Sequence, residues 1–181
     1  MVADTREPRL WWRHLISFLL APVTMTLVIP VSIVITTHRW PSDLGSGLKV
    51  GLAVVGGLMI AGGVALLVWT VLLFDRVGKG TLGVGKVMGE PVNLVVRGPY
   101  RHVRNPMISG VLWILLGEAA VMASGWLLLW FAVFAAFITS LIRFWEEPHL
   151  VERYGSEYIT YQQNVPAWIP RISAWETSNV S

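Results

Sequence analysis

The sequence predicts an all-α integral membrane protein with about four transmembrane helices, folded as a single domain over residues 1–181. Two observations carry this prediction. Hydrophobic residues make up 54% of the chain and charged residues only 14%, and long apolar blocks divide it. Soluble domains carry about 25% charged residues, so this composition indicates a bilayer as the solvent. The chain has no cysteine, which excludes disulfides, thiolate metal ligands and cysteine nucleophiles.

The first two apolar blocks are predicted to be single spans. Leu15 to Thr37 contains no charged residue and is long enough to cross a hydrocarbon core of about 30 Å. We read it as an uncleaved membrane helix, because it lacks the small-residue cleavage site of a signal peptide. The second span runs from Val50 to Phe74. A stripe of small residues at every fourth position, which we expect to face another helix, consists of Ala53, Gly57, Ala61 and Ala65.

The third apolar block, Met107 to Ile142, is too long for one helix with ordinary tilt. It is interrupted by Ala123-Ser124-Gly125, so we expect a C-terminal helical hairpin. Of the 14 Lys and Arg residues, all but Arg39 and Lys49 fall in the N-terminal arm, the 75–106 loop or the C-terminal region. The positive-inside rule therefore predicts that both termini are cytoplasmic.

The segment between the second and third blocks is the most informative part of the chain. Residues 97–106 read Arg-Gly-Pro-Tyr-Arg-His-Val-Arg-Asn-Pro. Pro106 suits the first turn of a helix, which makes Asn105 the predicted N-cap, and such a helix start offers free N–H donors. An acidic pair, Glu146-Glu147, follows Arg143 where the hairpin ends. From the pattern alone, a charged binding site and a combination of topology-setting arginines with solvated glutamates are equally good interpretations.

Other classes of site have weaker support. Glu146 and His149 have a metal-binding spacing, but no second such motif accompanies them, so we expect no metal site. The basic residues adjoin apolar spans and include no nucleic-acid reader, so we expect anionic lipid and no nucleic acid as their partner. Glu118 is the single acid inside a predicted span, which makes it a second candidate for a functional residue.

The second half of the chain resembles the isoprenylcysteine carboxyl methyltransferases and the related membrane phospholipid methyltransferases. The resemblance covers residues 94–171, with order and spacing kept. The shared elements are Gly98-x-Tyr100, Arg104-Asn105-Pro106, Glu146-Glu147, Tyr154-Gly155-x-x-Tyr158-x-x-Tyr161 and Val165-Pro166…Ile169-Pro170. Three positions depart from the family pattern: Asn105 replaces a histidine, Ile108 an aromatic residue and Ala167 a basic one.

The resemblance implies an S-adenosylmethionine pocket at the cytoplasmic mouth of the bundle, built from the 75–106 loop and the C-terminal tail. Glu146 would meet the cationic end of the cofactor. Arg143 would orient a carboxylate acceptor, and Glu147 would serve as the base for an amine acceptor. By position, the cofactor pocket would comprise Asn93, Leu94, Val95, Tyr100, Asn105, Pro106, Met107, Ile108 and Glu146.

The resemblance therefore predicts methyl transfer to a lipophilic acceptor at the membrane, most like carboxyl O-methylation of an isoprenylcysteine. Three alternatives stay open: a phospholipid amine N-methyltransferase, an NADPH-dependent membrane enone or sterol reductase, and a non-catalytic membrane protein. The sequence does not choose the acceptor, and it says nothing about oligomeric state.

Overall fold

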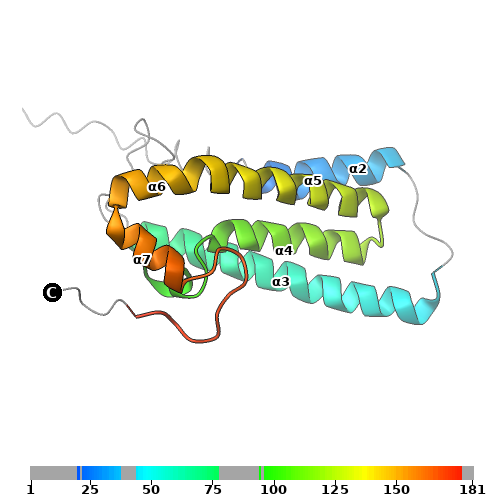
Figure 1. The fold of residues 1–181 in the computed structure, drawn as a ribbon. Coiled ribbons are helices and arrows are strands. Elements are labelled where there is room, and N and C mark those ends of the chain that lie inside the picture. Colours follow the sequence, from blue (N-terminus) through cyan, green and yellow to red (C-terminus); the bar gives the residue numbers. More distant parts are fainter. Residues whose placement is uncertain (1–19, 21, 38–43, 78–93, 95, 177–181) are drawn as a thin grey trace, which may run out of the picture.

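The computed structural model describes residues 20, 22–37, 44–77, 94 and 96–176, and every regular element among them is a helix. Helices α3, α4 and α5 lie side by side, with α4 between the other two (Figure 1). The predicted all-α class is thus confirmed for the described residues. In chain order the elements are η1 (Thr24–Val28), α2 (Ile29–Thr37), α3 (Ser46–Val77), η2 (Gly98–Arg101), α4 (Pro106–Val121), α5 (Gly125–Leu141), η3 (Ile142–Glu146), α6 (Glu147–Tyr154) and α7 (Ser156–Asn164).

Helices α3 and α4 pack against each other through glycines. Gly56 faces Gly117 and Gly63 faces Gly110, so the two helices run antiparallel. A Cβ atom added at Gly56 would lie 2.6 Å from the Gly117 carbonyl oxygen, and one at Gly63 would lie 2.6 Å from the Gly110 oxygen. The backbones therefore touch directly, which is the packing that small residues permit between membrane helices.

The prediction of which small residues on α3 contact another helix is wrong. Ala53, Gly57, Ala61 and Ala65 are all exposed, and nothing in the described structure lies within 4 Å of a Cβ added at Gly57. The actual contact uses glycines seven residues apart, which repeat on one helix face every two turns. At Gly56 and Gly63 the backbone of α4 is so close that an alanine would not fit. A repeat of Ala and Gly at every fourth residue does not show which positions must be glycine.

The predicted hairpin is confirmed. Helix α4 ends at Val121, and Ala123 takes a left-handed backbone conformation with φ of 44°. The Ser124 hydroxyl then accepts a hydrogen bond of 3.4 Å from the Leu127 N–H and caps helix α5. The core of the bundle joins α4 to α5 through Val111, Leu115 and Phe134.

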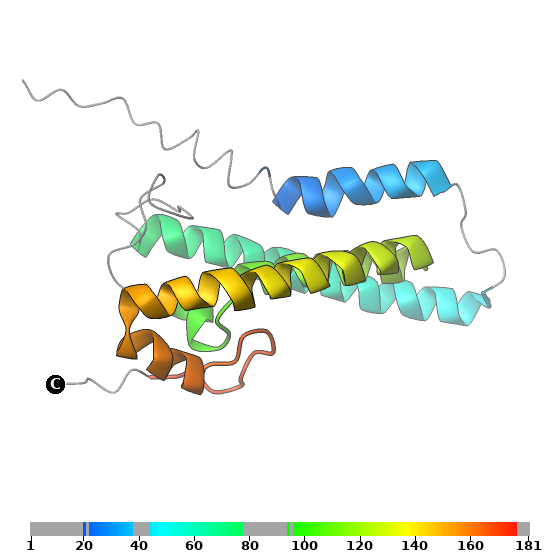
Figure 2. The ribbon, with the colours of Figure 1, turned by 45° about the horizontal axis from the view of Figure 1, so that its top comes forward.

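The last apolar helix continues further than expected. Instead of ending near Ile142, it runs without a break through η3 and α6 to Tyr154 (Figure 2). Pro148 has no N–H, and the wide π turn η3 immediately before it accommodates this loss. The Glu147 N–H bonds to the Ile142 carbonyl, which leaves the Arg143 carbonyl without its usual α-helical donor.

A second π turn, η1, precedes Pro30 in the same way. The Ile29 N–H is taken by the Thr24 carbonyl, so the Met25 carbonyl loses its helical donor. The Trp130 indole on α5 donates to that oxygen at 3.3 Å and fastens the first helix to the hairpin. In both places a proline and a widened turn free a carbonyl for contacts outside the helix.

Two helical stretches are long and apolar enough to cross a membrane, Ser46–Leu73 and Gly125–Tyr154. Two further apolar stretches are shorter, Thr24–Thr37 and Pro106–Val121. The four-span topology and the cytoplasmic position of the termini stay predictions.

Candidate functional site

The basic segment forms a tight turn that leads into helix α4. Gly98, with φ of +55°, starts the single 3-10 turn η2 in a conformation that favours glycine. Pro99 and Val103 are buried beneath it. Tyr100, whose side chain is half-buried, lies in this turn ahead of the start of α4.

Helix α4 begins at the predicted residue, but its start is not capped in the predicted way. Asn105 occupies the N-cap position and Pro106 the first turn, as expected. The Asn105 side chain makes no capping bond and instead donates through Nδ2 to the Ala167 carbonyl at 3.3 Å. Because no side chain caps this helix, its first N–H donors remain available near the half-buried Met107 and Ile108.

The acidic pair divides between two faces of one helix. Arg143 and Glu147 are four residues apart and share a face, whereas Glu146 projects from the neighbouring face. Burial raises the pKa of Tyr100, and the charge of Glu146 adds to this shift to a smaller degree. The residues expected to hold the cofactor and those expected to act on the acceptor therefore lie on adjacent sides of the π turn.

Both carboxylate oxygens of Glu147 accept hydrogen bonds from other side chains of the protein. Its Oε1 accepts a charge-assisted hydrogen bond from Arg104 at 2.5 Å, and its Oε2 accepts from the Gln162 amide at 3.0 Å. The Arg104 and Glu147 side chains are only 11% and 15% exposed. This ion pair joins the start of α4 to the start of α6, because Arg104 lies two residues before the first residue of α4 and Glu147 is the first residue of α6.

Buried tyrosines support the turn that carries Tyr100. The Tyr161 hydroxyl donates to the Tyr100 carbonyl at 2.7 Å. Burial raises the pKa of both Tyr161 and Tyr100. The Tyr161 and Glu146 groups raise the pKa of Tyr100 further. Both phenols consequently stay protonated, and Tyr161 remains a hydrogen-bond donor, at any ordinary pH.

A cavity of about 320 Å³ lies on the Arg143 side of the π turn. Arg143 is exposed and has no hydrogen bond or ion pair within the described residues. Arg104, by contrast, is held by Glu147. The free positive charge in the cavity is therefore that of Arg143. The lining comprises Arg104, Thr139, Ser140, Ile142, Arg143, Phe144, Glu147, Ala167 and Trp168.

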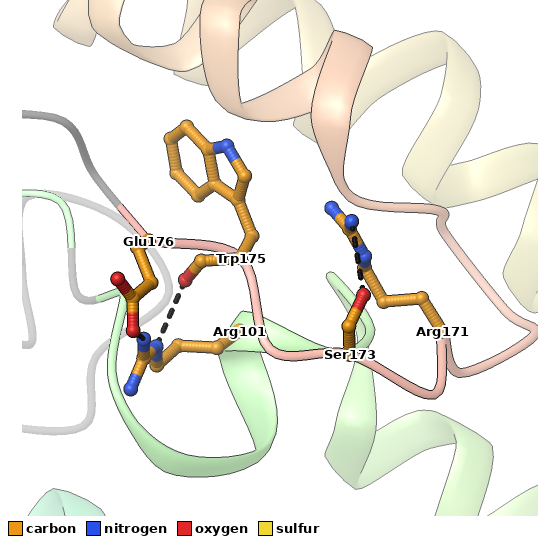
Figure 3. A network of polar contacts seen from close by, with 5 residues as sticks. All are labelled: Arg101, Arg171, Ser173, Trp175 and Glu176. Atoms are coloured by element: carbon orange, nitrogen blue, oxygen red, sulfur yellow. Dashed lines mark hydrogen bonds and ion pairs between the residues drawn. The ribbon is translucent and has the colours of Figure 1, made fainter.

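The C-terminal tail binds the back of the η2 turn (Figure 3). Arg101 donates through Nε to the Trp175 carbonyl at 2.8 Å and pairs with Glu176 at 3.1 Å. The Trp175 N–H donates to the Arg101 carbonyl at 2.9 Å, and the Trp175 ring packs on Tyr161 with centroids 5.8 Å apart. The tail is therefore fixed to the turn that carries Tyr100 by both side-chain and backbone hydrogen bonds.

The remaining predicted residues fall into three groups. Asn93 and Val95 lie outside the described residues. Leu94 packs against the buried cluster of Tyr158, Tyr161 and Val165. Glu118 is half-buried in α4, and its Oε2 atom has no hydrogen-bond partner in the described structure. In that part of the chain no three His, Asp or Glu side chains gather as a metal site would require.

Sequence reasoning missed several contributors to the site. Gln162 and Trp175 carry no recognisable motif, and the sequence pattern left Arg104 open between a charged binding site and a topology-setting residue. The signal that could have identified Arg104 is its place next to Asn105-Pro106, because the residue before a helix start is within reach of whatever packs there. Trp168 lies near the predicted membrane interface in the sequence, and in the structure it lines the cavity.

Together these features define a membrane helical bundle with a charged site where α4 begins. The family model for phospholipid methyltransferases matches residues 52–157, more than half of the chain. The chain belongs to this family of membrane methyltransferases, as the resemblance predicted. No curated protein and no solved structure matches it significantly.

Proposed function

We propose that the protein transfers a methyl group from S-adenosylmethionine to a lipid-like acceptor that carries an anionic group. The observation that carries this proposal is the division of charge at the π turn: Arg143 lines the cavity on one face, and Glu146 projects from the neighbouring face. A methyltransferase must bring a cationic methyl donor and a nucleophilic acceptor together, and the two adjacent faces suit these two tasks. Membership of the methyltransferase family supports the same reaction.

The cofactor side is proposed to comprise Glu146, Tyr100 and the start of α4. S-adenosylmethionine supplies an electrophilic methyl group on a sulfonium when it is bound. The Glu146 carboxylate offsets a positive charge there, and the uncapped N–H groups of α4 suit a carboxylate. Asn105, Pro106, Met107, Ile108 and Leu94 would form the surrounding wall, and Asn93 and Val95 are proposed for it from the resemblance alone.

The acceptor side is proposed to use Arg143. A guanidinium binds a carboxylate through two parallel hydrogen bonds, which aligns the attacking oxygen for an in-line displacement. In that displacement the carboxylate oxygen bonds to the methyl carbon, the carbon–sulfur bond breaks and the sulfur keeps the electron pair. Carboxyl methylation needs no base, which agrees with a Glu147 whose two oxygens are already occupied.

Methylation of a phospholipid amine is the second candidate, and the description of the matching family favours it. An amine acceptor must lose a proton, and Glu147 would have to release Arg104 or Gln162 to accept it. Arg143 would then bind the lipid phosphate. In either case we propose that the site faces the cytoplasm, because the chain's Lys and Arg residues concentrate on that side of the predicted spans.

The cofactor can be tested by thermal unfolding of the purified protein in detergent with S-adenosylmethionine, S-adenosylhomocysteine or NADPH. We expect the first two to raise the unfolding temperature and NADPH to leave it unchanged. Glu146→Gln keeps the shape of the side chain and should abolish the shift while the protein stays folded. Stabilisation by NADPH alone would establish the reductase alternative, and no stabilisation by any of the three would favour a non-catalytic protein.

The acceptor can be tested with the donor labelled in its methyl group. An S-farnesylcysteine derivative with a free carboxylate should become labelled, and its methyl ester should not. Phosphatidylethanolamine in the same detergent tests the amine alternative. Arg143→Gln should raise KM for the acceptor several-fold without changing the stabilisation by S-adenosylmethionine. If the variant also lost that stabilisation, Arg143 would belong to the cofactor side.

A further inference from the structure

The loop that follows helix α7 carries the most exposed apolar side chains of the C-terminal region. We call residues 165–176 the tail loop. Ile169 is 79% exposed and Ile172 is fully exposed at 102%. The match to the family model ends at residue 157, before this loop begins.

The tail loop is fixed at the level where the apolar bundle begins. The Arg104 N–H donates to the Pro166 carbonyl at 2.9 Å, and the Asn105 N–H donates to the Ala167 carbonyl at 3.3 Å. Pro106, the next residue, starts the apolar helix α4. Figures 1 and 2 both show the loop extending past the end of α7 and turning back alongside the bundle.

The isoleucines are exposed by a loop that is itself well held. The Arg171 N–H donates to the His102 carbonyl at 3.0 Å, and the His102 ring nitrogen donates to the Arg171 carbonyl at 2.9 Å. The Arg171 side chain donates to the Asn164 carbonyl at 2.7 Å. It also donates to the Ser173 hydroxyl at 3.3 Å (Figure 3). Arg171 thus fixes the chain between two side chains that point away from the protein.

The apolar surface continues from this loop onto the end of the long helix. Phe144 and Trp145 on η3 are 76% and 73% exposed. Phe144 and Trp168 line the same cavity, so the helix and the tail loop form its two walls. Aliphatic side chains next to tryptophan, at the end of apolar helices, are typical of the boundary between lipid headgroups and acyl chains.

We propose that the tail loop inserts Ile169 and Ile172 into the membrane interface and holds the Trp168 wall of the cavity at headgroup depth. The bilayer is the occupant that this surface fits, because Trp168 of the loop shares its cavity with Phe144 on the long apolar helix, and that helix exposes further apolar side chains such as Val133 and Phe137. Insertion buries side chains that the protein itself leaves uncovered.

The absence of cysteine permits a direct measurement of depth. The variants I169C and I172C would each carry a nitroxide label in phosphatidylcholine nanodiscs, and the accessibility of the label to oxygen and to a water-soluble nickel complex would be compared. L58C, at a position 69% exposed in the middle of α3, gives the lipid reference. Q163C, at an exposed position on the polar helix α7, gives the water reference.

We expect the ratio of oxygen to nickel accessibility at 169 and 172 to be several-fold above that of Q163C and to approach that of L58C. Labels that match Q163C would overturn the proposal. A second outcome would also overturn the proposal. If spectra broaden through spin–spin interaction when a nanodisc holds more than one protein, and not when it holds one, the surface would belong to a contact with a second copy of the chain. The readout does not depend on methyl transfer, so it stands apart from the proposed function.

Discussion

Helix α4 is held in two different ways along its length. In its middle, Gly110 and Gly117 touch the backbone of α3 directly. At its beginning, Arg104 and Asn105 bind α6 and the tail loop through an ion pair and hydrogen bonds. The comparison shows how a small membrane protein can build a charged site: close backbone packing aligns α4 with α3, and the ion pair and hydrogen bonds that join α4 to α6 and the tail loop lie at the end where the site is.

The two regions should therefore respond differently to substitution. In the glycine contact an added atom has no space, so the cost is steric. At the polar end a lost partner leaves a charge or a donor uncompensated, so the cost is electrostatic. The following substitutions test this difference, from the largest expected effect to the smallest.

Glu147→Ala should be the most damaging single change at the polar end. It leaves the nearly buried Arg104 without its counter-charge, and breaking a buried pair costs about 3–5 kcal/mol. The measurement is the free energy of unfolding in mixed micelles titrated with SDS.

The double variant Arg104→Met with Glu147→Leu is its matched control, because it removes both charges. It should recover most of the lost stability. Equal losses in the single and double variants would mean that the pair is not coupled.

Gly63→Ala should destabilise the bundle by steric overlap. The new Cβ would lie 2.6 Å from the Gly110 carbonyl oxygen, and overpacking of this kind costs about 1–3 kcal/mol. Gly57→Ala on the same helix adds the same atom where nothing lies within 4 Å. It should leave the unfolding free energy unchanged or raise it by about 0.5–1 kcal/mol. Equal effects at the two positions would refute the direct backbone contact.

Trp175→Ala should loosen the Tyr100 turn with little effect on the bundle. It removes an aromatic contact with Tyr161 that is worth about 0.5–1.5 kcal/mol. We expect a small loss of stability and, if the proposed cofactor site is correct, a weaker stabilisation by S-adenosylmethionine. Trp175→Phe keeps an aromatic ring and should retain most of both. Unchanged cofactor stabilisation in the alanine variant would show that the tail does not position the turn.

Glu176→Gln should have the smallest effect. Its ion pair with Arg101 is exposed, with side chains 34% and 85% accessible, and such pairs contribute about 0–1 kcal/mol. Any loss should disappear as salt is raised, since exposed pairs are screened. A larger, salt-independent loss would mean that the tail depends on this pair more than on its backbone hydrogen bonds.

Composition and local pattern determined several features of this protein without its structure. The apolar blocks predicted helices, because a membrane requires every backbone group to be bonded within its own segment. The Ala123-Ser124-Gly125 break predicted the hairpin, and Asn105-Pro106 predicted the start of α4. The resemblance around Tyr100 and Glu146 predicted the methyltransferase family. The helices, the hairpin and the start of α4 depend on residues that are neighbours in the chain, and the family resemblance depends on short motifs that keep their order and spacing.

The tertiary structure decided which helix faces and which side chains contact one another. It selected Gly56 and Gly63 for the helix contact and left Ala53, Gly57, Ala61 and Ala65 exposed. It joined Arg104 to Glu147 across 43 positions and Arg101 to Trp175 across 74. The physical reason is that periodicity fixes which side chains share a face, whereas the partner of that face depends on helix rotation and on the path of the tail, which only packing sets.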